Sequence, residues 1–266
     1  MNKISEKEFN FKGGVLIIGS LLWQDYLNKN DTVRKMWREN NLLEKDKILV
    51  KAPIRYGRRS SSGIYTMTFS NSCSKNRMGT CYLVPLRQTP TTTFSKIKQE
   101  SEELSNAEGM KKQFLGKSKH GEIWSALGIL INQNSVERKT AQSIYAKWKK
   151  LIDQNDGFNP KDFKIGREKC CINKFGKLNF DWPIAIDKRN EDAVNKIDFI
   201  IATVTRPTNY PKITELAEKV NSDTSRYYFI ENYKAGITTF QDIGIINKMP
   251  ATNSSTMQAA RPASID

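Results

Sequence analysis

The sequence predicts a single α+β domain with a closed or strongly curved sheet. Three observations support this fold class. Predicted strands alternate with predicted helices along most of the chain, no segment has the composition of a long linker, and no internal repeat is present. A chain of 266 residues buries well over half of its surface on folding, so a hydrophobic core suffices to stabilise it.

The first half of the chain contains the clearest patterns. An apolar stretch, Val15 to Ile18, is followed by Gly19 and Ser20, which predicts a buried strand that enters a tight turn. The polar, glycine-bounded segment 57–63 predicts a loop between two further strands. Strands are expected at 48–56, 64–69 and 79–86, and a helix at about 93–108.

The second half continues the alternation and ends in a segment of different composition. Strands are expected at 123–131, 182–186 and 198–205, and helices at 136–152 and, with a break, between 210 and 233. The last residues, 250–266, are rich in Ala, Ser, Pro and Thr and have almost no large apolar side chains, which is typical of a disordered tail. The expected domain therefore spans 1–249.

The charge and hydropathy of the chain limit the kinds of partner that it can have. Lysine and arginine number 43 against 28 acidic residues, and the net charge of +15 favours an anionic partner such as nucleic acid, an acidic membrane surface or a small anion. A lysine-rich surface without a dedicated partner is the alternative. No apolar stretch exceeds the length of a strand, so no membrane-spanning segment is expected. The N-terminus lacks the apolar core of a signal peptide, which predicts a cytoplasmic protein.

Cysteine and histidine usage argues against metal and histidine chemistry. Cys73, Cys81, Cys170 and Cys171 form no C-x-x-C pair, and His120 is the only histidine, so a zinc site of the usual Cys/His types is not expected. The same scarcity excludes most Ser-His-Asp and Cys-His catalysis unless His120 is itself the base. Its polar surroundings predict an exposed loop instead.

The strand-to-turn segment Ile18, Gly19, Ser20, Leu21 and Leu22 is the strongest candidate binding element. A glycine directly after a buried strand lets the backbone approach a ligand, and successive N–H groups there can bind a carboxylate or phosphate. The alternative is a strand that simply ends in a turn. The segment is neither a P-loop nor a G-x-G-x-x-G motif.

A second candidate element is the basic segment around Arg55, Tyr56 and Arg58. Three arginines fall within five residues, since Arg59 follows directly. Such a cluster can bind a small carboxylate or phosphate through paired N–H groups, contact a nucleic-acid backbone, or form a solvated hairpin tip. The residues leave these three alternatives open.

Glu108 is one of the glutamates of the predicted helix 93–108 that could act as an acid/base. Its competitors are Glu100, Glu102 and Glu103, although consecutive charges in mid-helix usually form a solvated face. Phe94, Ile97 and Leu104 share one helix face, and Glu108 follows Leu104 by four residues, so its carboxyl group lies on the side of the core if the helix persists. Burial raises the pKa of a carboxyl group, which suits a base that must also return a proton. Alternatively, the helix frays before Gly109 and Glu108 is exposed.

Two of these motifs together resemble a known family. Gly19-Ser20-Leu21-Leu22 after an apolar strand resembles the signature of the γ-glutamylcyclotransferase-like superfamily, and Glu108-Gly109 matches its Glu-Gly ending after a later strand, here 79–85. The resemblance covers 13–110 and implies a small mixed, barrel-like sheet with helices, to which 120–249 would add a C-terminal α/β elaboration. The sequence departs from the family pattern at Ile18, where a tyrosine is usual.

The resemblance also implies an activity. The enzyme would cyclise a γ-glutamyl amide to 5-oxoproline and release an amine or amino acid, with Glu108 as acid/base and the segment 18–22 holding the substrate. Arg55 or Arg58, with Tyr56 between them, would bind its carboxylate, and no metal or organic cofactor is implied. One alternative is a non-catalytic protein on the same fold that holds an anionic metabolite or nucleotide. Another is a basic nucleic-acid-binding protein that uses 55–59 and the lysines of 136–150.

Overall fold

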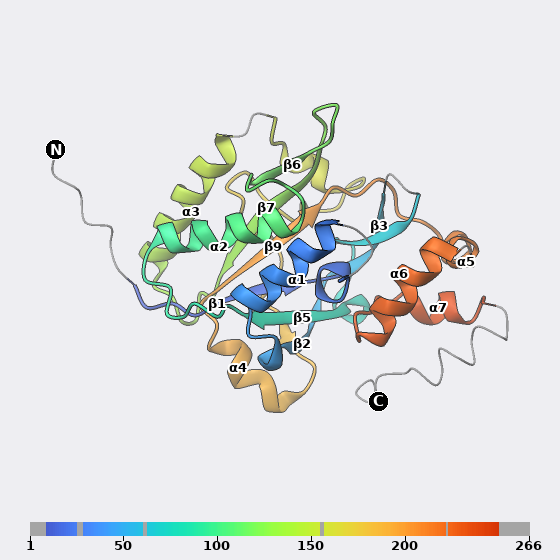
Figure 1. Ribbon diagram of the computed structural model, residues 1–266, viewed down its shortest axis with the longest axis horizontal. Helices are drawn as coiled ribbons and strands as arrows, with labels where there is room; N and C mark the ends of the chain where they lie inside the picture. Colours follow the sequence, from blue (N-terminus) through green and yellow to red (C-terminus); the bar gives the residue numbers. More distant parts are fainter. Residues whose placement is uncertain (1–8, 26–28, 61–62, 155–156, 222, 250–266) are drawn as a thin grey trace.

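The computed structural model describes residues 9–25, 29–60, 63–154, 157–221 and 223–249, so the predicted tail at 250–266 lies outside the described residues. The fold is mixed α+β, with strands forming a seven-stranded sheet and a separate two-stranded sheet (Figure 1). The strands of the larger sheet, in spatial order, are β6 (Leu115–Lys117), β7 (Ile123–Ile131), β9 (Phe199–Thr205), β1 (Gly13–Ile17), β5 (Gly79–Pro85), β2 (Ile48–Ala52) and β8 (Ile184–Ala185).

The smaller sheet and the helices complete the fold. The smaller sheet pairs β3 (Ile54–Arg59) with β4 (Tyr65–Phe69). The helices are α1 (Lys29–Asn41), α2 (Phe94–Ala107), α3 (Arg138–Asp153), α4 (Glu191–Asn195), α5 (Ile213–Val220), α6 (Asp223–Lys234) and α7 (Asp242–Ile246). Helix α1 packs beside α2, and both lie in front of the large sheet in the view of Figure 1.

The larger sheet is open, so the prediction of a closed, barrel-like sheet is wrong. Its edge strands are β6 and β8, which span three and two residues and do not pair with each other. The predicted strand 48–56 is also divided, because Pro53 lacks an N–H group and the chain leaves the ladder there. The residues after Pro53 form β3 in the other sheet and therefore cannot contribute to closure.

Strand β1 occupies the middle of the large sheet. It pairs antiparallel with β5 and parallel with β9, and β9 pairs antiparallel with β7. Val15, Leu16 and Ile17 are all buried, as are Phe199 and the apolar residues that follow it in β9. The two halves of the chain thus build one core, and β1 ends inside it.

Most of the predicted elements coincide with the structure. Strands at 64–69, 79–86, 123–131 and 198–205, and helices at 93–108 and 136–152, are confirmed to within two residues. The predicted loop at 57–63 is wrong in its first part, because β3 continues through a bulge at Gly57 to Arg59. Ser61 and Ser62 lie outside the described residues.

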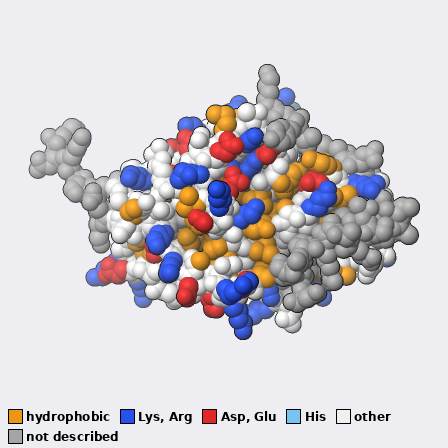
Figure 2. All heavy atoms as spheres, turned by 60° about the horizontal axis from the view of Figure 1, so that its bottom comes forward, with side chains coloured by type: hydrophobic (Ala, Val, Ile, Leu, Met, Phe, Trp, Pro, Cys, Tyr) orange, Lys and Arg blue, Asp and Glu red, His pale blue; other side chains and the backbone are white. Residues whose placement is uncertain are grey.

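One face of the molecule shows how its basic side chains are distributed (Figure 2). On the face seen in Figure 2, lysine and arginine side chains are scattered among apolar, acidic and other polar ones. Within the described ranges, every helix is too short or too polar to cross a bilayer.

Candidate functional site

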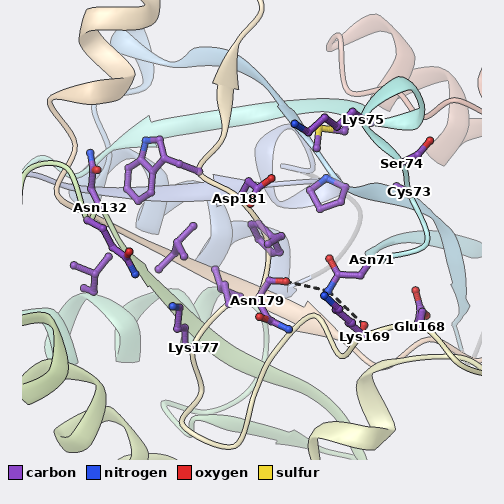
Figure 3. A pocket seen from close by; sticks show the side chains of 18 of the residues that line it. Asn71, Cys73, Ser74, Lys75, Asn132, Glu168, Lys169, Lys177, Asn179 and Asp181 are labelled. Carbon is purple, nitrogen blue, oxygen red and sulfur yellow. Dashed lines mark hydrogen bonds between the residues drawn. The ribbon is translucent and has the colours of Figure 1, made fainter. Parts of the chain in front are cut away.

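Among the hollows lined by the described residues are two that are each large enough to hold a ligand. The larger has a volume of about 890 Å³ and is lined by residues of 53–78, 130–134 and 167–182 (Figure 3). The smaller, of about 430 Å³, lies at the end of β1 and is lined by Ile18, Gly19, Ser20, Leu21, Arg58 and Glu108 among others. We take the smaller one, called the β1 cavity below, as the candidate active site because half-buried titratable groups, Arg58, Glu108 and Tyr228, line it.

The turn after β1 contributes backbone donors to this cavity. Ile18 and Gly19 leave the strand, and a single 3-10 turn, Ser20–Leu22, follows. The amide of Leu22 donates to the carbonyl of Gly19 at 3.1 Å, and that of Gln24 donates to Ser20 at 2.9 Å. Within the described chain, the amides of Gly19, Ser20 and Leu21 find no acceptor. They are available to bind a ligand oxygen.

Gly19 is required by a close approach of Tyr228, which α6 brings to the turn. A Cβ atom at position 19 would lie 2.7 Å from the hydroxyl oxygen of Tyr228. That oxygen accepts a hydrogen bond from the amide of Met67 at 3.3 Å, and burial raises the pKa of Tyr228 to about 12. The hydroxyl therefore stays protonated and can donate its proton to a ligand.

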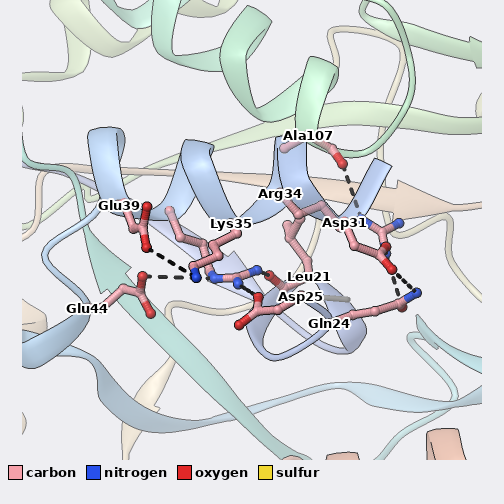
Figure 4. A network of polar contacts seen from close by, with 10 residues as sticks. Leu21, Gln24, Asp25, Asp31, Arg34, Lys35, Glu39, Glu44 and Ala107 are labelled. Carbon is pink, nitrogen blue, oxygen red and sulfur yellow. Dashed lines mark hydrogen bonds and ion pairs between the residues drawn. The ribbon is translucent and has the colours of Figure 1, made fainter. Parts of the chain in front are cut away.

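A side chain of helix α1 holds the turn in place. The buried guanidinium of Arg38 donates through Nη1 to the carbonyl of Leu21 at 2.6 Å and pairs through Nη2 with Asp25 (Figure 4). A charged hydrogen bond to the turn carbonyl holds that peptide plane in place. The contact thereby fixes the turn whose residues Gly19, Ser20 and Leu21 line the cavity.

Arg34, one helical turn earlier, connects the two predicted motifs. Its Nη1 atom donates to Oε1 of Gln24 at 3.1 Å and forms an ion pair with Asp31 at 3.5 Å. Its Nε atom donates to the carbonyl of Ala107 at 3.3 Å, directly before Glu108 (Figure 4). A single side chain thus ties the turn after β1 to the end of α2.

The end of α2 places Glu108 at the cavity. The amide of Met110 donates to the carbonyl of Ser105 at 2.8 Å, and that of Gly109 donates to Asn106 at 3.0 Å, which together form a Schellman motif. Gly109 has a φ of 78°, a left-handed conformation that glycine adopts without strain. The helix persists to its cap at Glu108, whose side chain lines the cavity.

Opposing effects act on the carboxyl group of Glu108. Burial raises its pKa, while Arg34, the hydroxyl of Thr203 and Arg58 act to lower it. Burial also lowers the pKa of Arg58, an effect that Glu108 and Tyr228 oppose. A partly desolvated carboxyl group beside cations can accept a proton and return it.

Strand β9 adds two threonines to the cavity wall. The hydroxyl oxygens of Thr203 and Thr205 are buried and have no hydrogen-bond partner in the described part of the chain. Thr203 is close enough to Glu108 to lower its pKa, although the two groups do not meet hydrogen-bond geometry. Buried polar groups without a partner are rare, and they indicate a place for water or ligand.

The bulge at Gly57 decides which basic residue reaches the cavity. Tyr56 pairs with Met67 and Arg58 with Thr66, so the extra residue turns Arg58 to the opposite face of β3 from Tyr56. Arg58 lines the cavity with Thr66, and its guanidinium lies 4.9 Å from the ring centre of Trp124.

Three of the sequence-predicted residues lie outside the β1 cavity. Leu22 is buried in the core. Arg55 stacks 3.9 Å from the ring centre of Tyr210 and donates to Ser72, away from the cavity. The buried ring of Tyr56 packs near Phe229 in the core.

Sequence reasoning missed several residues that line the cavity. They are Arg34, Thr66, Trp124, Thr203, Thr205 and Tyr228. Thr203 and Thr205 left a signal, since two polar residues at a spacing of two interrupt an otherwise apolar strand. Among the described residues, no group of three or more His, Cys, Asp or Glu side chains is arranged to hold a metal ion.

Comparison of the chain with protein-family models, with curated proteins and with solved structures finds no match. The resemblance to the γ-glutamylcyclotransferase-like superfamily therefore stays a prediction.

Proposed function

We propose that the protein is a γ-glutamylcyclotransferase-like enzyme that converts a γ-glutamyl amide to 5-oxoproline and a free amine or amino acid. The observation that supports this most is that Glu108 and the turn Gly19–Ser20–Leu21 line one cavity. The two motifs are almost ninety residues apart in the sequence.

The reaction requires the protein to position the substrate and to move protons from the attacking nitrogen to the leaving nitrogen. The substrate's α-nitrogen attacks its own γ-carbonyl carbon, so a C–N bond forms in the ring while the γ-amide C–N bond breaks. The reacting atoms are already tethered, which favours ring closure once the chain is folded. The α-ammonium group loses two protons as its nitrogen becomes the lactam N–H. Glu108 takes them one after the other and passes them to the leaving nitrogen, which departs as an ammonium group.

The remaining groups bind the substrate and its developing charge. The amides of Gly19, Ser20 and Leu21 would hold the carbonyl oxygen as it becomes negative. Arg58 would bind the α-carboxylate, because the hydrogen bonds of Arg34 are directed to the protein and Arg55 lies elsewhere. The hydroxyls of Thr203 and Thr205 offer further hydrogen bonds to the same substrate.

The test follows 5-oxoproline release from a panel of γ-glutamyl amines and γ-glutamyl amino acids. Wild-type protein should turn over at least one of them, and Glu108→Gln should lower kcat by about 10²–10⁴ because the amide cannot accept the proton. Glu102→Gln on the same helix is the matched control, since Glu102 pairs with Lys98 on the outer face. A wild-type protein that releases no 5-oxoproline from any substrate would refute the proposal.

A second candidate is a non-catalytic protein that holds an anionic metabolite in the same cavity. Ile18 favours it, because an apolar side chain stands where the resembled family has a hydroxyl group. Binding of γ-glutamyl compounds without turnover, lost in Arg58→Met, would support this alternative. The nucleic-acid hypothesis based on 55–59 has less support, since Arg59 is the one exposed arginine of that segment.

A further inference from the structure

The larger hollow, here called the distal groove, shares no lining residue with the β1 cavity. Its walls come from the end of β7, the segment between β4 and β5, and the long connection between α3 and β8. With about 890 Å³ it has roughly twice the volume of the β1 cavity and lies at the upper end of the range for small-molecule sites.

Basic side chains surround the groove without acidic partners. Lys75, Arg167 and Lys169 are exposed at its rim and form no ion pair within the described chain. Lys177 is half-buried, and its ammonium group lies 5.3 Å from the ring centre of Tyr145. Figure 3 shows Lys75, Lys169 and Lys177 on different sides of the hollow. A ligand in the groove would thus meet cations from several directions.

The lining contains two acidic residues, and the carboxylate of one of them already accepts several hydrogen bonds from the protein. The carboxylate of Glu168 accepts from the hydroxyl of Ser70 at 2.7 Å, from the amide of Ser72 at 2.9 Å and from the amide of Ile165 at 2.8 Å. The hydroxyl of Tyr210 also donates to it. Asp181 is the other acid, so the groove retains an excess of positive charge.

An indole ring and free amide groups accompany the cations. Trp182 is half-buried in the lining, and its Nε1 atom is buried without a partner among the residues described. Gln133 and Asn134 are exposed in the same lining. Asn132 plays a structural part instead, because its amide donates to the carbonyls of Asn195 and Ile197 at 3.2 and 3.0 Å.

We propose that the distal groove binds a phosphate-bearing nucleobase compound, either a free nucleotide or a short single-stranded nucleic acid. Cations match the phosphates, the indole of Trp182 offers a surface on which a base stacks, and amide side chains match the edges of bases. An acidic peptide would use the cations without the indole. A neutral glycan would use the indole and amides and leave the cations unpaired.

The first test measures fluorescence anisotropy of a 5′-labelled hexauridylate with full-length protein. Lys75→Ala/Lys169→Ala should weaken binding by at least tenfold. The slope of log Kd against the logarithm of the salt concentration should become smaller by about 1.4, the value for two lost phosphate contacts. The matched control is Lys45→Ala/Lys248→Ala, which removes the same charge from exposed positions outside the groove and should change Kd by less than twofold. Equal losses in both variants, or no binding by wild type, would overturn the proposal.

The second test separates base recognition from phosphate attraction. Trp182→Leu should weaken hexauridylate binding about fivefold to a hundredfold while thermal unfolding shows the variant to be folded. UMP and inorganic phosphate then compete with the labelled strand. UMP competing as well as unlabelled hexamer identifies a free nucleotide, and a hexamer at least tenfold better identifies a strand. Phosphate competing as well as UMP, with Trp182→Leu unchanged, would contradict base recognition.

Discussion

The β1 cavity and the distal groove both contain charged side chains, but these differ in their exposure to water. In the cavity, burial acts on Glu108, Arg58 and Tyr228 and shifts the pKa of each. In the groove, Lys75 and Lys169 are exposed to water. Desolvated groups whose protonation is poised suit chemistry, whereas solvated cations suit the attraction of a polyanion. Burial therefore separates the two proposed roles more than residue type does.

The largest expected effect is that a variant in one region loses that region's activity and keeps the activity of the other region. Glu108→Gln should lower turnover by about 10²–10⁴ and change hexauridylate binding by less than twofold. Lys75→Ala/Lys169→Ala should do the reverse. Both variants are assayed for 5-oxoproline release and for anisotropy. Loss of turnover in the groove variant would mean that the regions are coupled, and the comparison would fail.

Asp242 lines neither region and serves as a comparison for Glu108. Both carboxyl groups have their pKa raised by burial, but arginines lower the pKa of Glu108 only. Burial raises the pKa of Asp242 to about 7, and the opposing contacts come from Thr239 rather than from an arginine. The pKa of Asp242 is therefore higher in the folded protein than in the unfolded chain. Its contribution to the free energy of unfolding is fully present below about pH 4 and is lost as the pH rises to about 7. Asp242→Asn should remove this loss, which amounts to at most about 4 kcal/mol.

The measurement for Asp242 is urea unfolding at pH 4.5 and pH 7.5. The difference in unfolding free energy between the two pH values should shrink in Asp242→Asn and persist in Asp46→Asn, an exposed control. An unchanged pH dependence in Asp242→Asn would show that this carboxyl group is not the source of the effect.

A smaller effect is expected from the contact between Gly19 and Tyr228. Gly19→Ala places a methyl group 2.7 Å from the tyrosine hydroxyl, and such overpacking typically costs about 1–3 kcal/mol. Tm should fall by several degrees, and Tyr228→Phe in the same chain should restore most of it by removing the oxygen. Differential scanning calorimetry of the single and double variants checks this. A double variant as unstable as Gly19→Ala would argue against the contact.

The smallest effect concerns the arginine that joins the two motifs. Arg34 lowers the pKa of Glu108, so Arg34→Met should move the acidic limb of the pH profile of kcat/KM to higher pH. Lys35→Met, on the same helix and paired with Glu39, is the control. A limb that moves to lower pH, or not at all, would contradict the assigned electrostatic role.

Elements with complete local signals were predicted well. The helix expected at 93–108 matches α2 because Thr93 caps it, accepting from the amide of Lys96, and Gly109 ends it. The prediction of a closed sheet was wrong. Whether a sheet closes depends on which strands lie at its two edges and whether those strands pair with each other. The edges β6 and β8 are set by pairings between distant segments, and no local pattern reports them.

The candidate site shows the same division between local and distant information. Gly19 and Glu108 stand in short motifs that a single segment displays. Tyr228 reaches the cavity from a Tyr-Tyr-Phe run on α6 that resembles ordinary core sequence, and Arg34 resembles any solvated helical arginine. Their roles follow from helix packing against β1 and α2, which the sequence alone does not specify.

The parallel pairing of β1 with β9 has a consequence for synthesis of the chain. The amide of Lys12 donates to Asp198, 186 residues later, so one neighbour of β1 leaves the ribosome only after most of the protein has been made. Until then the apolar edge of β1 has no strand to pair with on that side, and unpaired edges of this kind promote aggregation. Long-range pairing also slows folding. We expect the nascent chain to depend on chaperones until β9 emerges.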